Sequence, residues 1–565
     1  MKKDLTIYLP GGCITPPENP YGRLIANYGL YKAMYEYGGY ESIHFQTARN
    51  NTAQSISSDL SSGRGERTII SEGSPDDVSH AIKSGTLLSG QPYLKDLAWT
   101  RRSKSNDSAY SIIGSIFAFA SPRHREEMMF STIAPLQEWD ALICSSPKLE
   151  IVVSNTFDEW EDYLRERFGA KVIKRPKLPV IPIGVEVERV IEQATNISLR
   201  KKIREENNIH DDEIVILFLG RLSFYDKSFP QATFRAIGEA QKRTGIKTHF
   251  IMAGWFPDKC RDRKRFTEIA SAYALDLNVI YLDGNDKNIV AQCWAGADIF
   301  ISLSDTVLET FGQAPVEAMA AGLPVVMSDW NGYEYIARDG VDGFLIPTLG
   351  AEHSQIGETL ATLESMNSLP YANYMGSIAQ HTAVHVELAT QALTNLIKSP
   401  ELRRKMGEAG KRRAIESFSW SVVAKKYIET FDELSEIRLK QEDIKASIRL
   451  PRKMNPLRND PFYDYRVYPS MVITPSLIIY LEQDAEKYNE VVLKNSTIEL
   501  DGIFAGFRAR SQECSRILDI LENGARISVE ELSNEFPSHR RPFIRMTLMW
   551  LMKRGIISWI PKEKR

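Results

Sequence analysis

Five short apolar runs, separated by helix-length segments, constrain the fold of this chain more than any other feature. In chain order they occupy residues 213–219, 248–253, 279–282, 298–303 and 324–327. Strands buried on both faces appear as continuous apolar runs, and strands that alternate with helices form parallel sheets. The pattern predicts an α/β domain with a doubly wound parallel sheet at residues 186–410.

The chain before this domain has a similar but weaker pattern. The apolar run Leu5–Leu9 ends in Pro10-Gly11-Gly12, and an apolar-periodic segment follows at Tyr21–Tyr37. This order is typical of a strand, a glycine turn and a helix. Residues 133–146 and 172–185 contain further strand candidates. We therefore expect another α/β domain at residues 1–185, in which the polar segment 50–110 is hard to assign.

The C-terminal part of the chain has a different composition. Residues 441–475, rich in Pro, Asn and Tyr, indicate an extended linker. Beyond it, Ser528–Glu531 has the signature of a capping box, and a helix at Phe543–Lys553 precedes a short apolar run. The order helix, short helix, helix, strand predicts a small winged-helix-like domain at residues 476–565.

Size and composition exclude several classes of protein. A chain of 565 residues forms two to four domains, and 70 basic against 73 acidic residues leave a net charge of −3. That balance provides no overall field for nucleic acid. The five cysteines have no CxxC spacing, and no stretch of about 18 apolar residues suggests a membrane span. We expect a cytoplasmic protein, or one peripheral at the inner face of a membrane, without a metal site.

The segment Asp305–Val326 carries the clearest chemical signal. Pro315 suits the first turn of a helix and Gly322 its C-terminal cap, so a helix is expected at residues 314–321. Backbone N–H groups at the start of a helix bind phosphate or sugar hydroxyls. These groups belong to Phe311, Gly312 and Gln313.

Two carboxylates flank this predicted helix start, Glu309 in the loop and Glu317 in the expected first turn. A carboxylate can accept two hydroxyl hydrogen bonds at once, which suits a ribose or a hexose. Alternatively, Glu317 complements the helix dipole and Glu309 is simply solvated. The spacing alone leaves both interpretations open.

Seven residues separate Glu309 from Glu317, and AMAAGLPVV follows. This pattern resembles the Glu-x7-Glu signature of retaining glycosyltransferases of family four. The similarity extends to Gly220–Lys227, Phe250–Gly254 and Asp329–Pro347, and more weakly across residues 1–435. It implies the GT-B fold: two Rossmann-like, doubly wound domains facing a cleft, with helices at residues 411–440 crossing back to the first domain. It also implies a nucleotide-diphosphate sugar as donor and no metal.

The resemblance assigns Arg221 and Lys227 to the donor diphosphate, whose charge they neutralise as the glycosidic bond breaks. The family usually has these two residues one position closer, so the intervening loop is longer here. Many relatives also have a first-domain histidine near the position of residues 114–119, where this chain has none. His124 is the fallback candidate, with a surface position as the alternative.

The remaining assignments follow from the same resemblance. Glu317 holds the ribose hydroxyls, and Glu309 contacts sugar hydroxyls beside the reacting carbon. The backbone of Phe311–Gly312 faces the sugar, and Gly11–Gly12 allows close approach to the phosphates from the opposite domain. A plain tight turn is the alternative for the two glycines.

Together these expectations predict a retaining, metal-independent glycosyltransferase. It would act on a glycan or lipid-linked acceptor in bacterial envelope polysaccharide synthesis. Two rivals remain: another GT-B enzyme, such as a sugar-nucleotide epimerase or phosphorylase, and a DNA-binding regulator. Basic side chains cluster near the last helix, but its apolar residues are needed for a core, and charged faces are usually solvated. We therefore expect the last domain to contact a partner enzyme or a membrane surface rather than nucleic acid.

Overall fold

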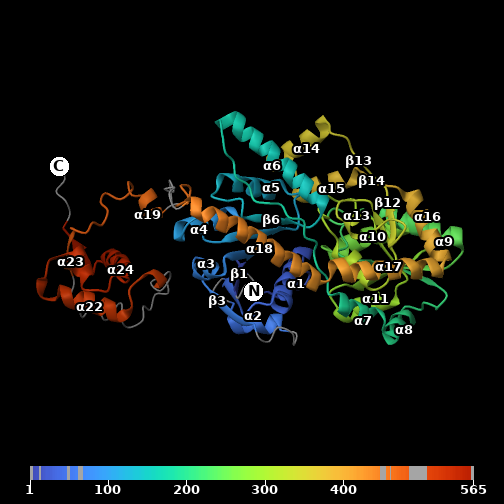
Figure 1. Cartoon of the computed structure of the whole chain (residues 1–565), viewed down its shortest axis with the longest axis horizontal. Helices are drawn as coiled ribbons and strands as arrows, with labels where there is room; N and C mark the ends of the chain where they lie inside the picture. Colours follow the sequence, from blue (N-terminus) through green and yellow to red (C-terminus); the bar gives the residue numbers. More distant parts are fainter. Residues whose placement is uncertain are drawn as a thin grey trace. The chain divides into compact units, whose positions relative to one another are not determined.

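The computed structural model describes residues 4–11, 14–47, 51–61, 68–445, 454–458, 460–482 and 505–560. The chain consists of two compact units, Met1–Asn455 and Pro456–Arg565 (Figure 1). The first unit contains two parallel sheets of six strands each, and the second contains a small antiparallel sheet with helices.

The first sheet has the strand order β3-β2-β1-β4-β5-β6, and all its pairings are parallel. Its strands are β1 (Asp4–Leu9), β2 (Ser42–Thr47), β3 (Ile69–Gly73), β4 (Thr86–Ser89), β5 (Ser111–Ile116) and β6 (Ala141–Cys144). Its helices are α1 (Gly22–Tyr37), α2 (Ala53–Leu60), α3 (Ser79–Ser84), α4 (Lys95–Lys104), α5 (Pro122–Met129) and α6 (Pro147–Phe168), with a 3-10 turn at Phe130–Ile133.

The second sheet has the order β12-β11-β10-β7-β8-β9 and is also parallel. Its strands are β7 (Ile214–Leu219), β8 (Thr248–Gly254), β9 (Asn278–Asp283), β10 (Ile299–Ser302), β11 (Val325–Ser328) and β12 (Gly343–Ile346). Its helices are α7 (Val187–Ala194), α8 (Ile197–Glu206), α9 (Gln231–Thr244), α10 (Lys259–Tyr273), α11 (Lys287–Gly296), α12 (Gln313–Ala320), α13 (Tyr333–Ile336) and α16 (Val386–Lys398).

Both sheets are wound in the same way. In each, the first strand in the chain lies beside the fourth, so that the second and third strands extend to one side and the fifth and sixth to the other. The predicted pair of doubly wound, Rossmann-like α/β domains is therefore confirmed. In such sheets, ligands bind outside the carboxyl ends of the strands, where the strand order reverses. These switch points lie between β1 and β4 and between β7 and β10.

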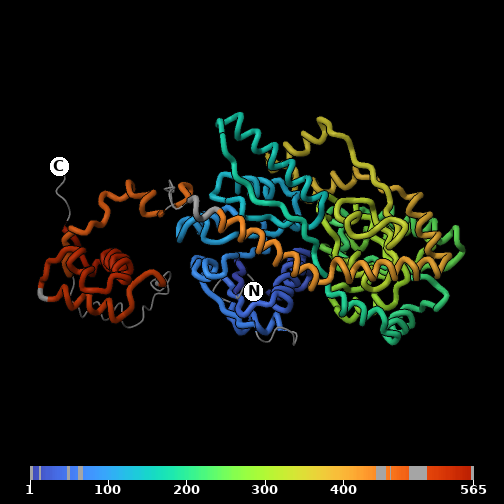
Figure 2. The backbone as a smooth tube through the Cα atoms, viewed as in Figure 1, coloured from blue at the N-terminus to red at the C-terminus, as the bar shows by residue number. Residues whose placement is uncertain are grey.

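Two long helices follow the second domain, α17 (Pro400–Phe418) and α18 (Trp420–Lys445). The tube in Figure 2 shows α18 returning along the first domain. Its side chains Val423, Tyr427, Phe431 and Leu434 are buried in the same cluster as Leu30 and Met34 of α1. Burial of this apolar face ties the end of the first unit to its beginning.

The segment 349–380 of the second domain, which has weak periodicity in the sequence, folds mainly as two helices. They are α14 (Gln355–Ser365) and α15 (Tyr371–Gln380), flanked by the antiparallel strands β13 (Thr348–Gly350) and β14 (Thr382–Val384). None of the residues of α14 is buried. Within the described ranges, no helix is both long and apolar enough to cross a membrane.

The second unit is built around β15 (Ile478–Leu481), which lies between β16 (Ile527–Ser528) and β17 (Ile557–Trp559). Its helices are α19 (Pro461–Asp464), α22 (Ser511–Leu521), α23 (Val529–Asn534) and α24 (Arg541–Lys553), with 3-10 turns at Ala505–Phe507 and Glu522–Gly524. The predicted capping box is present, because Ser528 and Glu531 bond reciprocally. The central strand β15 precedes α22, α23 and α24 in the chain, and the winged-helix expectation did not include this strand.

Candidate active site

The loops that follow β7 and β10 meet at the switch point of the second sheet. Lys227 of the first loop places its Nζ 2.7 Å from Oε2 of Glu309 in the second. The backbone N–H of Phe229 donates to Asp305 at 3.0 Å, and the hydroxyl of Ser304 donates to the carbonyl of Lys227 at 3.1 Å. These bonds bring together two of the predicted catalytic residues from opposite sides of the strand-order reversal.

Arg221 lies at the start of the first loop, directly after Gly220. Its guanidinium pairs with the carboxylate of Asp226 and lies over two aromatic rings, 4.5 Å from the centroid of Tyr21 and 5.6 Å from that of Trp255. Tyr21 is the residue before α1. The first domain therefore reaches this guanidinium, and both the cation–π contacts and the ion pair fix its position.

The predicted helix start is the N-terminus of α12, one residue earlier than expected. Gly312 is the N-cap residue, with φ 108° and no side chain to occupy the first N–H groups. A Cβ at this position would lie 2.5 Å from Cε1 of Tyr333, so both the backbone conformation and the space require glycine. The free N–H groups at this helix start can bind an anion or a hydroxyl oxygen.

The other predicted residues at the start of α12 are Phe311 and Gln313. The ring of Phe311 is buried against Phe418, with 5.9 Å between centroids, so only its backbone can meet a ligand. The amide of Gln313 donates to the carbonyl of Gly184 at 3.4 Å, which links α12 to the segment that leaves the first domain. The ring of Phe311 is therefore not available to recognise a sugar.

Glu317 lies in the second turn of α12 and not in the first turn, because the helix begins at Gln313. Burial raises the pKa of its carboxyl to about 7, and the nearby charge of Arg189 opposes the shift. Asp305, which the sequence interpretation did not single out as a site residue, is also buried, and burial raises its pKa to about 8. Two carboxyl groups of this region, those of Asp305 and Glu317, therefore have raised pKa values.

The loop Glu309–Gly312 is held from the first domain as well. Thr310 donates its hydroxyl to the carbonyl of Phe117, after β5, at 3.0 Å. Ser146, after β6, donates to Oδ1 of Asn331 at 3.1 Å, and the amide nitrogen of Asn331 donates to the carbonyl of Glu309 at 3.0 Å. The carboxyl edges of the two sheets therefore meet at this loop.

The predicted role of Gly11 and Gly12 stays a prediction. Gly11 is exposed, and a Cβ added there would have no neighbour within 4 Å, so the fold itself does not require glycine. Gly12 lies outside the described residues. Tyr21, Asp226 and Asp305 contribute to the site although no motif pointed to them.

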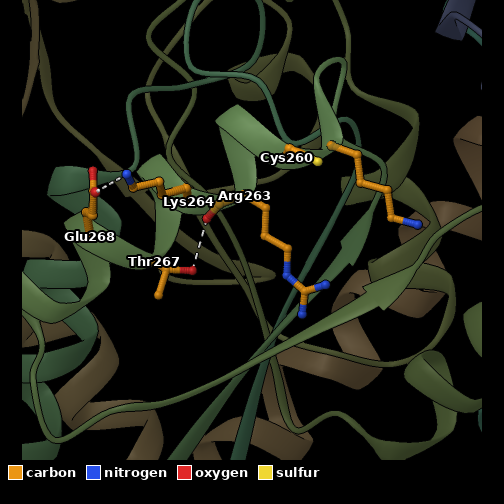
Figure 3. A pocket seen from close by; sticks show the side chains of 6 residues that line it. Cys260, Arg263, Lys264, Thr267 and Glu268 are labelled. Carbon is orange, nitrogen blue, oxygen red and sulfur yellow. Dashed lines mark hydrogen bonds and ion pairs between the residues drawn. The ribbon is translucent and has the colours of Figure 1, made fainter.

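A separate surface hollow lies on α10 and is lined by Lys259, Cys260, Arg263, Lys264, Thr267 and Glu268 (Figure 3). All six side chains come from this one helix, which precedes β9 at the far edge of the sheet from β12. Neither switch-point loop contributes to the hollow, so it is not the candidate active site.

Part of the second domain matches a family model. Residues 200–382, which include Arg221, Lys227, Glu309 and Glu317, match the family model described as glycosyl transferases group 1. Spore coat protein SA of Bacillus subtilis is 22% identical over 262 residues, 46% of this chain and 59% of that protein. Alpha-monoglucosyldiacylglycerol synthase of Streptococcus pneumoniae is 29% identical over 238 residues, 42% of this chain and 47% of that protein.

The chain thus spans about half the length of these relatives. Among solved structures, HepE of Anabaena in complex with UDP-glucose is similar, with 12% identity, a TM-score of 0.48 and coverage of 76% of this chain and 99% of that one. The family match and the relatives support a place in the GT-B glycosyltransferase superfamily. The two doubly wound domains agree with that class.

Proposed function

We propose that this chain is a retaining glycosyltransferase that moves a sugar from a nucleotide-diphosphate sugar to a hydroxyl of a glycan or lipid-linked acceptor. One observation carries the proposal. Arg221, the pair Lys227–Glu309 and the uncapped start of α12 gather at one switch point, within the segment that matches the glycosyltransferase family model.

Arg221 and Lys227 are proposed to stabilise the leaving diphosphate. When the bond between sugar and diphosphate breaks, negative charge develops on the diphosphate, and fixed positive charges stabilise that transition state. Arg221 and Lys227 each already have a carboxylate partner, Asp226 and Glu309. These partners hold the cations in place before the reaction, so little reorganisation is needed when the charge develops. We propose that this arrangement makes a metal ion unnecessary.

Glu309 and Glu317 suit the recognition of hydroxyl groups. Glu309 accepts from Lys227 through one carboxylate oxygen, which leaves further acceptor sites for the sugar. Glu317, with a pKa of about 7, is partly protonated near neutral pH. Hydroxyl donors favour the charged form of a carboxyl group. Binding of the donor ribose is therefore expected to release a proton from Glu317.

The stereochemistry and the acceptor belong to the same proposal. In the retaining reaction the acceptor hydroxyl attacks from the face that the diphosphate leaves, and a departing phosphate oxygen takes its proton. The relatives include a spore coat protein and a glycolipid synthase, which supports an acceptor of the bacterial envelope. We propose a cytoplasmic enzyme, or one peripheral at the inner membrane face, whose second unit contacts a partner enzyme or the membrane.

The test begins with a search for the donor. A ligand that binds only the folded state raises apparent stability, so a panel of nucleotide-diphosphate sugars is screened for an increase in melting temperature. Transfer is then measured with Arg221→Ala and Glu309→Ala, with Arg243→Ala as control, because Arg243 pairs with Glu387 on a distant, exposed surface. Intact transfer in the first two variants would refute the site assignment.

Further assays on the same purified protein distinguish the alternative functions. Turnover of a nucleotide sugar without acceptor would indicate an epimerase, and release of a sugar phosphate from a glycan and inorganic phosphate would indicate a phosphorylase. A salt-dependent DNA gel shift that disappears when residues 476–565 are removed would indicate a DNA-binding regulator. Retention is checked by the anomeric configuration of the product in an NMR spectrum, where an inverted product contradicts the proposal.

A further inference from the structure

The helix α24 of the second unit has apolar side chains on two opposite sides. Its inner side is buried in the core of that unit through Ile544, Leu548 and Leu551. Met546 and Met549 lie on the other side of the helix and are 36% and 45% exposed. A surface helix of a globular protein usually has polar residues opposite its buried stripe. The outer side of α24 therefore departs from what contact with water alone favours.

Basic side chains flank the exposed methionines. The helix α24 contains three basic residues and no acidic one. Arg545 and Lys553 are each four positions from Met549, so both are its neighbours on the helix surface. Both are exposed, and neither forms an ion pair with another residue in the described ranges. The outer side of α24 is thus apolar and positively charged at once.

Trp550 borders the same side and brings further cations to it. The guanidinium groups of Arg508 and Arg554 lie over its ring, 4.2 and 4.5 Å from the centroid. These cation–π contacts hold both charges beside the indole. Phe507, directly before Arg508, is 70% exposed. Aromatic and basic residues together are enriched where a protein meets the headgroup region of a membrane.

We name this surface the α24 face and define it by Arg545, Met546, Met549, Trp550 and Lys553. Nucleic acid is bound mainly by polar groups that donate to phosphates and base edges, and the two central methionines provide no such donors. A protein partner would have to combine an apolar patch with clustered carboxylates. An anionic bilayer offers both properties over its whole surface, because acyl chains lie directly beneath the phosphates.

We propose that the α24 face binds an anionic membrane surface. The methionines and the tryptophan enter the headgroup region, and the basic side chains lie against lipid phosphates. The second unit is outside residues 200–382, so the family match does not account for this surface. The inference specifies one contact of the proposed function and rests on that function for its role in sugar transfer, whereas the binding to lipid does not.

The first test removes charge from the α24 face. The full chain is sedimented with vesicles of phosphatidylglycerol and, as the match without net charge, of phosphatidylcholine. The wild type is expected to bind only the anionic vesicles. Each basic residue near such a surface contributes about fivefold in affinity, so Arg545→Gln with Lys553→Gln is expected to weaken binding roughly 25-fold. The control is Lys201→Gln with Lys202→Gln, which removes two exposed charges from α8 and leaves the affinity unchanged.

The second test removes apolar area and leaves the charge as it is. Met549→Ser is expected to weaken binding to the anionic vesicles about tenfold, because less apolar surface enters the lipid. Leu275→Ser, at a position that is 79% exposed in the first unit, is the matched control and binds as the wild type does. The melting temperature of each variant checks that it is folded.

Three results would overturn the inference. One is a wild type that does not sediment with the anionic vesicles. Another is vesicle binding that the α24 variants and their controls weaken equally, because the contact would then lie elsewhere on the chain. The third is a DNA gel shift that the double variant Arg545→Gln, Lys553→Gln abolishes, without vesicle binding, which would assign the α24 face to nucleic acid.

The outcome is separable from that of the proposed function. A nucleotide-diphosphate sugar that raises the melting temperature of the wild type, with no vesicle binding, leaves the proposed function standing and removes the membrane contact. Vesicle binding that depends on the α24 face, with no nucleotide sugar bound or turned over, keeps the contact and removes the proposed function.

Discussion

Replacement of Lys227 by methionine tests the proposed leaving-group chemistry most directly. The side chain of Lys227 is 32% exposed, and its only ion pair in the described structure is with Glu309 at 2.7 Å. A partly exposed ion pair contributes roughly 0–1 kcal/mol to folding. Loss of one positioned group that stabilises developing charge costs about 2.7–4 kcal/mol in the transition state, or roughly 100- to 1000-fold in rate. We therefore expect Lys227→Met to lose activity far out of proportion to stability.

The assay follows release of the nucleoside diphosphate with the donor found by thermal screening. The quantity compared is kcat/KM, together with the melting temperature of each variant. Lys242→Met is the matched control, because Lys242 is exposed on α9 and, among the described residues, forms an ion pair only with Glu239 at 3.4 Å. A value of kcat/KM within about threefold of the wild type for Lys227→Met, in a folded protein, would falsify the assignment of this lysine to the diphosphate.

Three further predictions concern residues around the two sheets. Asp140→Asn leaves the fully buried Arg101 without the carboxylate that it contacts at 2.6 and 2.8 Å, so urea unfolding should show a loss of about 3–5 kcal/mol, and a loss below 1 kcal/mol contradicts this. Gly312→Ala places a Cβ in a conformation with φ 108° and against Tyr333, so we expect a loss of about 1–3 kcal/mol and weaker donor binding by calorimetry; an unchanged protein excludes the helix-start argument. The pKa of Glu317, raised from 4.5 to about 7, favours the protonated folded state, so the stability that it contributes is complete below about pH 4.5 and is lost as pH rises through 7. The melting temperature of Glu317→Gln should therefore gain on the wild type between pH 5 and pH 8, and a constant difference contradicts the shift.

The α/β architecture could be predicted because its strands are buried on both faces. The runs expected at 248–253 and 279–282 correspond to β8 and β9 with differences of one residue at their ends. The polar segment 50–110 resisted assignment for a physical reason. It contains β3, an edge strand with exposed side chains such as Ile69, and β4, which has only four residues. Neither forms an apolar run long enough to be distinguished from a loop.

The candidate site could be predicted only in part. Glu309 and the start of α12 followed from local features, namely a loop, Pro315 and Gly322 at defined spacings. The partner of Arg221 across the two domains, Tyr21, could not be predicted, because the two residues are 200 positions apart and no local pattern records that contact. The role of Asp140 was also decided by packing, since its burial against Arg101 makes it part of the core of the first domain.

The sequence by itself determined the class of fold and the kinds of side chain in the loops of the candidate site, because strand periodicity, helix capping and residue spacing are local properties. Only the tertiary structure decided which groups act together. It paired Lys227 with Glu309 across a reversal of strand order and placed Tyr21 of the first domain over Arg221. Charge, burial and hydrogen bonding act through space, so the properties of these side chains depend on neighbours that the fold brings from distant parts of the chain.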